Sequence, residues 1–372
     1  MLEKSPIDPL LLGQRVVVIL ETGRRTATYK LAVLVALIDY SVEHLPETST
    51  ASIDVPLNDL ADRIIEMYWR QVVPFEGTTH RLYQSTGEKS GDRALILDEI
   101  TQLRGAPDKH PRRTPAMARQ QVPMEYEQAR GRIVRVLVRQ PLYRLQKSSG
   151  TDNDDVFLYD DSWMNAKIGN REIGKHGNKI QLKPGVATGL ARLAGLLKPT
   201  IRIHWAEAVR AINPTINQEV PPVERYLFGT DRVALARAGN ALKDAFSKLC
   251  FYCNKRVATA VDHVLPWSRL GLDSLANLVP VCAPCNGSKL NAVPAVEHLV
   301  AALCRDRTKL EEIAARLHWP AEFSRVILAA RGIYLSTPEQ SPTWFSIGKS
   351  VPFEFSALPE WIRWPKPDQQ TE

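Results

Sequence analysis

The sequence has few cysteines and no long hydrophobic run, and both absences narrow the classes of protein that it can encode. Only five of its 372 residues are cysteine, which excludes a small secreted scaffold held together by disulfides. No apolar stretch approaches the roughly 20 residues that cross a bilayer. The N-terminus also lacks an apolar core followed by a small-residue cleavage site. We therefore expect a soluble, cytoplasmic protein.

The composition is that of a globular chain with a basic surface. With 44% hydrophobic residues, the chain can bury a substantial core and form two or three domains. Its formal net charge of +7 and pI of about 9.1 indicate a polyanionic partner. The charge is uneven, because residues 101–150 carry eleven lysines and arginines against three acidic residues. The net positive charge of this one segment therefore exceeds that of the whole chain.

The first hundred residues have the periodicity of helices. Residues 26–45 place apolar side chains at helical spacing, and a short extended piece at 51–55 leads into a second helix that opens near Pro56. A helix, a short strand and a helix fit a winged-helix-like DNA-binding module and a small helical scaffold equally well. We slightly favour the scaffold, because periodicity identifies elements better than it identifies topology.

The middle of the chain predicts a mixture of helices and strands. A basic link rich in proline and arginine ends at Pro123 and leads into a helix whose arginines at 132, 135 and 139 share one face. Those arginines have two interpretations: a solvated helix face, or a surface that follows a phosphate backbone. Further strands are expected at 156–161 and 179–184, and further helices at 185–198, 201–213 and 231–249, with Pro199 separating two of them.

Four of the cysteines form two CxxC pairs, Cys250 with Cys253 and Cys282 with Cys285. Two such pairs can supply four thiolates at the corners of a tetrahedron, which closes a structural zinc site. The 28 residues between the pairs exceed the roughly 15 to 20 of a common four-cysteine site. The segment between the two pairs is therefore expected to contain a further functional feature. The fifth cysteine, Cys304, is expected in the core.

The gap and the residues after it contain an ordered set of polar side chains. An Asp-His pair is followed by a proline, an asparagine lies before the second CxxC pair, and another asparagine lies directly after it. In order, these residues and a following lysine are Asp262, His263, Pro266, Asn277, Asn286 and Lys289. Together with the cysteine frame, this order resembles the HNH endonuclease family in its zinc-stapled ββα-metal form.

The resemblance implies a set of catalytic roles. His263 is the general base, Asp262 and Asn286 hold a divalent catalytic metal, Mg²⁺ or Mn²⁺, and Asn277 orients the loop that bears the histidine. Lys289 is expected to contact a phosphate. These residue types suit phosphodiester hydrolysis, because imidazole with a pKa of about 6.5 accepts a proton from water and carboxylate and amide oxygens suit a hard cation.

One position departs from the family pattern. The last motif residue is Asn286 instead of histidine, as in phage junction-resolving nucleases with the same four-cysteine frame, and this implies an oxygen ligand in place of an imidazole. Each residue also has an ordinary explanation when it is taken alone. Asp262 could be a turn residue, His263 a core histidine and Asn286 a helix N-cap. Their joint order with the cysteines favours the nuclease.

The periodicity, the composition and the resemblance together set the expected fold and domain division. We expect an α+β protein that is mostly helical and carries a ββα-metal module in its C-terminal half. The predicted domains are a helical region at 1–103, a basic link with a mixed α/β region at 104–222, the HNH domain at 223–337 and a proline- and aromatic-rich tail at 338–372. The tail is expected to pack as a strap on the protein, with docking of a partner as the alternative.

We therefore interpret the chain as a metal-dependent HNH endonuclease that hydrolyses DNA, with structural Zn²⁺ and catalytic Mg²⁺ or Mn²⁺. By family analogy alone, restriction or anti-phage defence is the favoured setting, and a separate ATPase or other defence subunit is a candidate partner. Two alternatives stay open. One is a non-catalytic zinc-stabilised nucleic-acid-binding or adaptor protein, and the other is a nuclease that cuts RNA.

Overall fold

The structure, a computed structural model, describes residues 7–22, 27–75, 78–89, 91, 94–105, 112, 114–147, 156–214, 223–229 and 232–364. The chain divides into two compact units. Unit 1 consists of Met1–Ser41 and Pro46–Gly229, and unit 2 of Val42–Leu45 and Thr230–Glu372. The finer four-part division of the sequence stays a prediction. None of the helices in the described ranges is long and apolar enough to cross a membrane.

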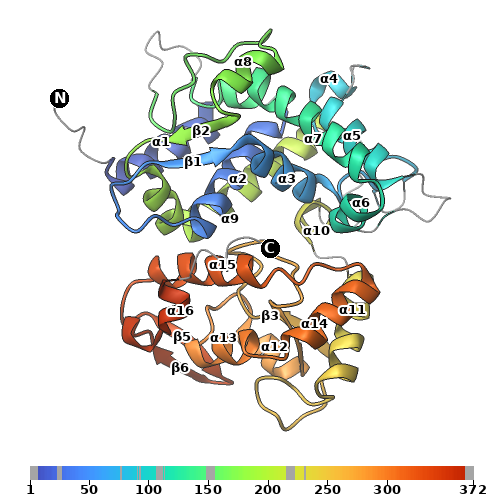
Figure 1. The fold of residues 1–372 in the computed structure, drawn as a ribbon, viewed down its shortest axis with the longest axis vertical. Coiled ribbons are helices and arrows are strands. Elements are labelled where there is room, and N and C mark those ends of the chain that lie inside the picture. Colours follow the sequence, from blue (N-terminus) through green and yellow to red (C-terminus); the bar gives the residue numbers. More distant parts are fainter. Residues whose placement is uncertain are drawn as a thin grey trace. The chain divides into compact units, whose positions relative to one another are not determined.

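Over its described residues, unit 1 is mostly helical and has one two-stranded sheet, β1–β2 (Figure 1). Its elements are α1 (Pro9–Thr22), α2 (Tyr29–Glu43, the end of which belongs to unit 2), β1 (Ile53–Pro56), α3 (Leu57–Tyr68), α4 (Thr86–Lys89), α5 (Leu95–Arg104), α6 (Pro115–Gln121), α7 (Pro123–Leu137), a π-helical turn (Val138–Leu142), α8 (Asn170–Lys175), β2 (Lys179–Leu182), α9 (Val186–Ile212) and α10 (Val223–Phe228).

The core of unit 1 forms around α2. Every residue from Leu31 to Ile38 is buried, so the most apolar stretch of the sequence is a core helix. The strand β1 pairs antiparallel with β2, with Val55 opposite Ile180, and this sheet joins two segments that are far apart in the sequence. Helix α1 packs against α9, and α3 and α5 pack against α7.

Two sequence expectations for unit 1 are wrong. Residues 156–161 do not form a strand. Tyr159 alone among them forms a β-bridge, an antiparallel one with Leu182 of β2. Pro199 does not separate two helices, since α9 continues through it. Apolar side chains on both sides of this proline are buried along one helix, and that burial outweighs the local cost of about 3 kcal/mol for an interior proline.

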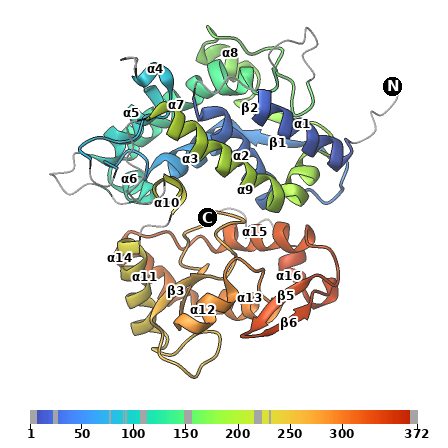
Figure 2. The ribbon, with the colours of Figure 1, turned by 180° about the vertical axis from the view of Figure 1, so that it is seen from behind.

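In the part of unit 2 that the structure describes, two small antiparallel strand pairs, β3–β4 and β5–β6, are accompanied by short helices (Figure 2). Its elements are α11 (Arg232–Ala245), β3 (Ala260–His263), β4 (Leu278–Val281), α12 (Ala283–Lys289), α13 (Val296–Leu303), α14 (Arg307–Leu317), α15 (Phe323–Leu335), β5 (Pro342–Ser346), β6 (Lys349–Pro352), a 3₁₀ turn η2 (Phe355–Ala357) and α16 (Glu360–Arg363).

The strands β3 and β4 and the helix α12 form the ββα unit that the sequence predicts. The strands are antiparallel, with Asp262 opposite Val279 and His263 opposite Leu278. Helix α11 packs against both strands, and it comes so close that a Cβ atom at Gly239 would lie 2.2 Å from a methyl group of Val261. The mostly helical α+β fold, with this module in the C-terminal half, is therefore confirmed.

The tail is more regular than an irregular strap. It forms the hairpin β5–β6, followed by η2 and α16, and its Trp344 is buried. The indole nitrogen of Trp344 donates to the Ser288 hydroxyl at 3.1 Å, which attaches the hairpin to α12. Cys304 is exposed, contrary to the sequence expectation, because it lies just after the last residue of α13.

Candidate active site and zinc centre

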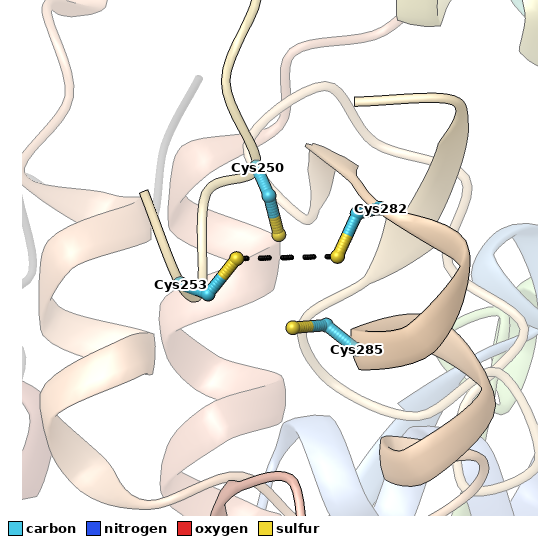
Figure 3. A group of neighbouring side chains, drawn as sticks. All are labelled: Cys250, Cys253, Cys282 and Cys285. Carbon is cyan, nitrogen blue, oxygen red and sulfur yellow. Dashed lines mark hydrogen bonds between the residues drawn. The ribbon is translucent and has the colours of Figure 1, made fainter. Parts of the chain in front are cut away.

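The four cysteines of the two CxxC pairs converge on one point (Figure 3). Their sulfur atoms all lie within 4.8 Å of one another, and the sulfur atoms of Cys253 and Cys282 are 3.9 Å apart. Four thiolates at about 2.3 Å from one tetrahedral zinc are separated by about 3.8 Å. All four cysteines are free of disulfides. The cluster therefore fits a structural zinc ion.

Local backbone structure supports the convergence of the cysteines. After the first pair, Asn254 adopts a left-handed conformation with φ of 50°, which asparagine tolerates better than most residues. Cys282 is the N-cap residue of α12, and Cys285 lies in its first turn.

Burial raises the pKa of Cys285. At Cys253 the effect of burial is outweighed by backbone hydrogen bonds from Lys255 and Arg256, which lower the pKa to about 6.

The Asp262 carboxylate is buried at the end of β3 and held by two donors. The Tyr252 hydroxyl donates to Oδ2 at 2.7 Å, and the Lys289 ammonium lies 3.0 Å from the same oxygen. Burial, together with the nearby carboxylate, raises the pKa of Tyr252 well above its ordinary value, so the phenol keeps its proton. Within the described part of the chain, Oδ1 of Asp262 has no hydrogen-bond partner.

His263 occupies the last position of β3, where successive side chains point to opposite faces of the strand. Its Nε2 atom lies 2.6 Å from Oδ1 of Asp273, and its ring centroid lies 5.1 Å from that of Trp267. The side chain is 9% exposed. Asp262 therefore faces the zinc knuckle and α12, while His263 faces the loop that connects β3 to β4.

Asn277 is fully buried, and its side chain forms hydrogen bonds with backbone groups near both ends of that loop. Its side-chain oxygen accepts from the backbone N–H of Leu265 at 2.7 Å, and its amide donates to the carbonyl oxygens of Leu265 at 3.2 Å and Leu272 at 3.1 Å. Arg305 adds donors to the carbonyls of Leu275, Ala276 and Leu278. The loop after His263 is thus fixed by polar side chains on its inner side.

Asn286 and Lys289 are three residues apart on α12 and share one face of this helix. Asn286 is half-buried, and its side chain makes no hydrogen bond to another described residue. Lys289 is buried, and its ammonium also donates to the backbone carbonyl of His263 at 2.8 Å. In this structure Lys289 therefore contacts Asp262 and His263, and its phosphate contact stays a prediction.

The three arginines of the basic segment already have partners in unit 1. Arg132 of α7 forms a bidentate ion pair with Glu99, at 2.7 and 2.8 Å. Arg135 donates to the Asn170 side chain, and Arg139, in the π-helical turn, donates to the carbonyl of Ile168. Parts of the basic link, residues 106–111 and 113, lie outside the described residues.

Sequence reasoning missed two side chains that contact the motif, Tyr252 and Asp273. Tyr252 lies between the two cysteines of the first CxxC pair, where its hydrogen bond to Asp262 has no sequence signal. Asp273 had a usable signal, because it is the only acidic residue between His263 and Asn277.

Comparisons with known proteins agree with this geometry. Residues 250–295 match the family model "HNH endonuclease", so the resemblance found in the sequence is confirmed for this segment, and the match implies a nucleic-acid substrate. Residues 12–226 match the family model "Domain of unknown function (DUF8808)". This second match covers more than half of the chain, so the protein belongs to that family. Searches of curated proteins and of solved structures found no match.

Proposed function

We propose that this protein is a metal-dependent endonuclease that hydrolyses the phosphodiester bonds of DNA. The observation that carries the proposal is the contact between α12 and the end of β3. Lys289 joins the two elements by binding Asp262 and the carbonyl of His263. Asn286 lies one turn earlier on the same helix face. These contacts bring Asp262, the backbone of His263 and Lys289 together beside the zinc centre, and they support a single small site that also includes Asn286.

His263 is the general base in this proposal. A neutral imidazole accepts a proton from water near neutral pH, and this one is held against a carboxylate at one nitrogen. A non-catalytic binding module has no need for this arrangement.

The residues at the site also fit a catalytic divalent cation. Oδ1 of Asp262 and the side-chain oxygen of Asn286 have no partner among the described residues, and both are hard oxygen donors. Mg²⁺ takes one or two protein oxygens and completes its shell with water and phosphate. When bound, such an ion neutralises charge on the phosphate and on the leaving oxygen. Tyr252 and Lys289 hold Oδ2, which leaves Oδ1 as the ligand atom.

DNA is the substrate that we favour, and unit 1 is the part that positions the substrate or a partner. The support is the net charge of +7 and the positive excess of residues 101–150, since phosphate contacts supply affinity without regard to sequence. Arg132, Arg135 and Arg139 would exchange their present partners for phosphates. A role in restriction or anti-phage defence, with a separate ATPase or other defence subunit as partner, rests on analogy with the HNH family.

The test is cleavage of plasmid DNA and of RNA, each with and without Mg²⁺ or Mn²⁺. General base catalysis contributes about 10² to 10⁴-fold, or about 3 to 5 kcal/mol of barrier. We expect His263→Ala to lose that much cleavage and to keep its zinc and its fold. His176→Ala is the matched control, because His176 is an exposed histidine of unit 1, and it should cut at the wild-type rate.

Asp262→Ala separates the metal role from the base role. Its cleavage should also fall, but higher Mn²⁺ should restore part of it, whereas no metal concentration should restore His263→Ala. Binding of Mn²⁺ to zinc-loaded protein, measured by calorimetry, should weaken in Asp262→Ala alone. A wild-type protein that cuts neither DNA nor RNA with any divalent metal would support the adaptor alternative, and one that cuts RNA only would replace the substrate.

A further inference from the structure

We propose that Asp273 is a positioning residue for His263: its carboxylate keeps the hydrogen of the neutral imidazole on Nε2, so that Nδ1 is the atom that takes the proton from water. The inference rests on the proposed nuclease function. It adds a residue that the motif does not contain, and it names the nitrogen that acts as the base.

The contact between the two side chains determines where the hydrogen lies. Oδ1 of Asp273 is 2.6 Å from Nε2 of His263. An ionised carboxylate only accepts hydrogen bonds, so the nitrogen that faces it carries the hydrogen. The other nitrogen of a neutral ring is then an acceptor. Within the described residues, Nδ1 has no hydrogen-bond partner, and the side chain as a whole is 9% exposed.

The position of Asp273 is itself fixed by a second segment. The indole nitrogen of Trp319 donates to the Asp273 backbone carbonyl at 2.5 Å. The next residues continue the attachment: Ser274 donates through its hydroxyl to the Ala321 carbonyl, and the backbone N–H of Leu275 donates to the Pro320 carbonyl at 2.9 Å. Residues 319–321 follow α14 and lie outside the segment that matches the HNH model.

The chemistry explains why a carboxylate is useful at this place. Without it, the ring of His263 can rotate, or its hydrogen can move to Nδ1. In either state no proton-accepting lone pair faces the water. Once the ring has taken a proton, an adjacent carboxylate also stabilises the imidazolium, as the aspartate does in the serine protease triad. Asp273 acts through His263 and touches neither the substrate nor the metal in this proposal.

The first experiment separates positioning from binding. In zinc-loaded protein, Asp273→Ala should lower kcat for plasmid cleavage by about 10²-fold and leave KM within about twofold, because the substrate contacts are unchanged. Asp273→Glu should recover part of the loss. Added Mn²⁺ should recover none, and recovery by Mn²⁺ would overturn the proposal in favour of a metal ligand. The control is Asp244→Asn, an exposed carboxylate of α11, which should match the wild type.

The second experiment needs no cleavage, so it distinguishes failure of this inference from failure of the proposed function. With ¹⁵N-labelled histidine, the ring nitrogen shifts of His263 report which nitrogen carries the hydrogen, and His263→Ala assigns the signals. The wild type should show the hydrogen on Nε2, and Asp273→Ala should show a mixture of tautomers. A wild type with the hydrogen on Nδ1, or a folded Asp273→Ala with wild-type kcat, would refute the assignment.

A third variant covers the case in which Asp273→Ala does not fold. Trp319→Phe keeps a ring in place and removes only the indole N–H that binds the Asp273 carbonyl. It should shift the His263 tautomer signals in the same direction as Asp273→Ala and lower kcat by less. Unchanged tautomer signals and unchanged kcat in folded Trp319→Phe would show that the attachment of the loop does not position the base.

Discussion

Asn277 is the residue through which the structure makes its most quantitative prediction about the site. The side chain is fully buried and makes three hydrogen bonds to the backbone of the loop between His263 and β4. Replacing it with alanine removes all three bonds and leaves the N–H of Leu265 and the carbonyl oxygens of Leu265 and Leu272 without these partners. The loop then loses the side chain that joins its two ends.

The size of the effect follows from these three bonds. A net contribution of about 1 kcal/mol for each bond gives about 3 kcal/mol for Asn277→Ala. For a unit of this size, each kcal/mol lowers Tm by roughly 2 to 4 °C, so we expect a fall of about 6 to 12 °C in the transition that includes unit 2. Cleavage should fall as well, because Asp273 and His263 are held by this loop.

The isosteric variant Asn277→Asp tests the hydrogen bonds separately from the volume of the side chain. It keeps the acceptor for Leu265 and turns the two donated bonds into contacts between oxygen atoms, so it should be at least as unstable as the alanine variant. Asn291→Ala is the control, because Asn291 is exposed just after α12. Thermal unfolding at fixed zinc concentration measures all three variants. A Tm for Asn277→Asp within 2 °C of the wild type would refute the reasoning.

Three further predictions concern the zinc, the basic face and the buried lysine. The wild type should contain about one zinc per chain, and Cys282→Ser should lose it and become protease-sensitive in the HNH domain, since metal binding and local folding are one event. Replacing Arg132, Arg135 and Arg139 with glutamine should weaken binding to many DNA sequences alike and reduce the salt slope by about 0.9 for each lost contact; an unchanged slope would favour the solvated-face interpretation. Lys289→Met should lower the free energy of unfolding in urea by about 3 kcal/mol, because it leaves a buried carboxylate without its cation.

The sequence predicts the zinc frame and the ββα order because both depend on local spacing. Each CxxC pair brings its own two sulfur atoms together by spacing alone, and the pairing of β3 with β4 brings the two pairs together, so that all four sulfur atoms lie within 4.8 Å of one another. The Asp-His pair and the asparagine after the second CxxC pair are likewise defined by short separations from those cysteines. Motifs of this kind can therefore be recognised without knowing which distant segments pack together.

Contacts between distant segments are less accessible to such reasoning. A lysine in a basic chain usually lies in solvent, and Lys289 is buried because β3 happens to present a carboxylate and a carbonyl to its helix face. Burial lowers its pKa, and the Asp262 carboxylate opposes that effect. Pro199 is the same kind of case, since the burial of α9 on both sides of the proline decides between one helix and two.

Asp273 shows most clearly what a motif leaves out. Its distance from His263 is ten residues along the chain, and nothing in the local sequence requires the loop to return the carboxylate to the histidine ring. That return depends on Asn277 inside the loop and on Trp319 and Ala321 outside it, and so on a segment beyond the matched HNH domain. In the proposed mechanism the motif supplies the reacting groups, whereas the surrounding unit orients the imidazole. Variants at Trp319 therefore test a part of the proposed mechanism that the motif residues alone do not contain.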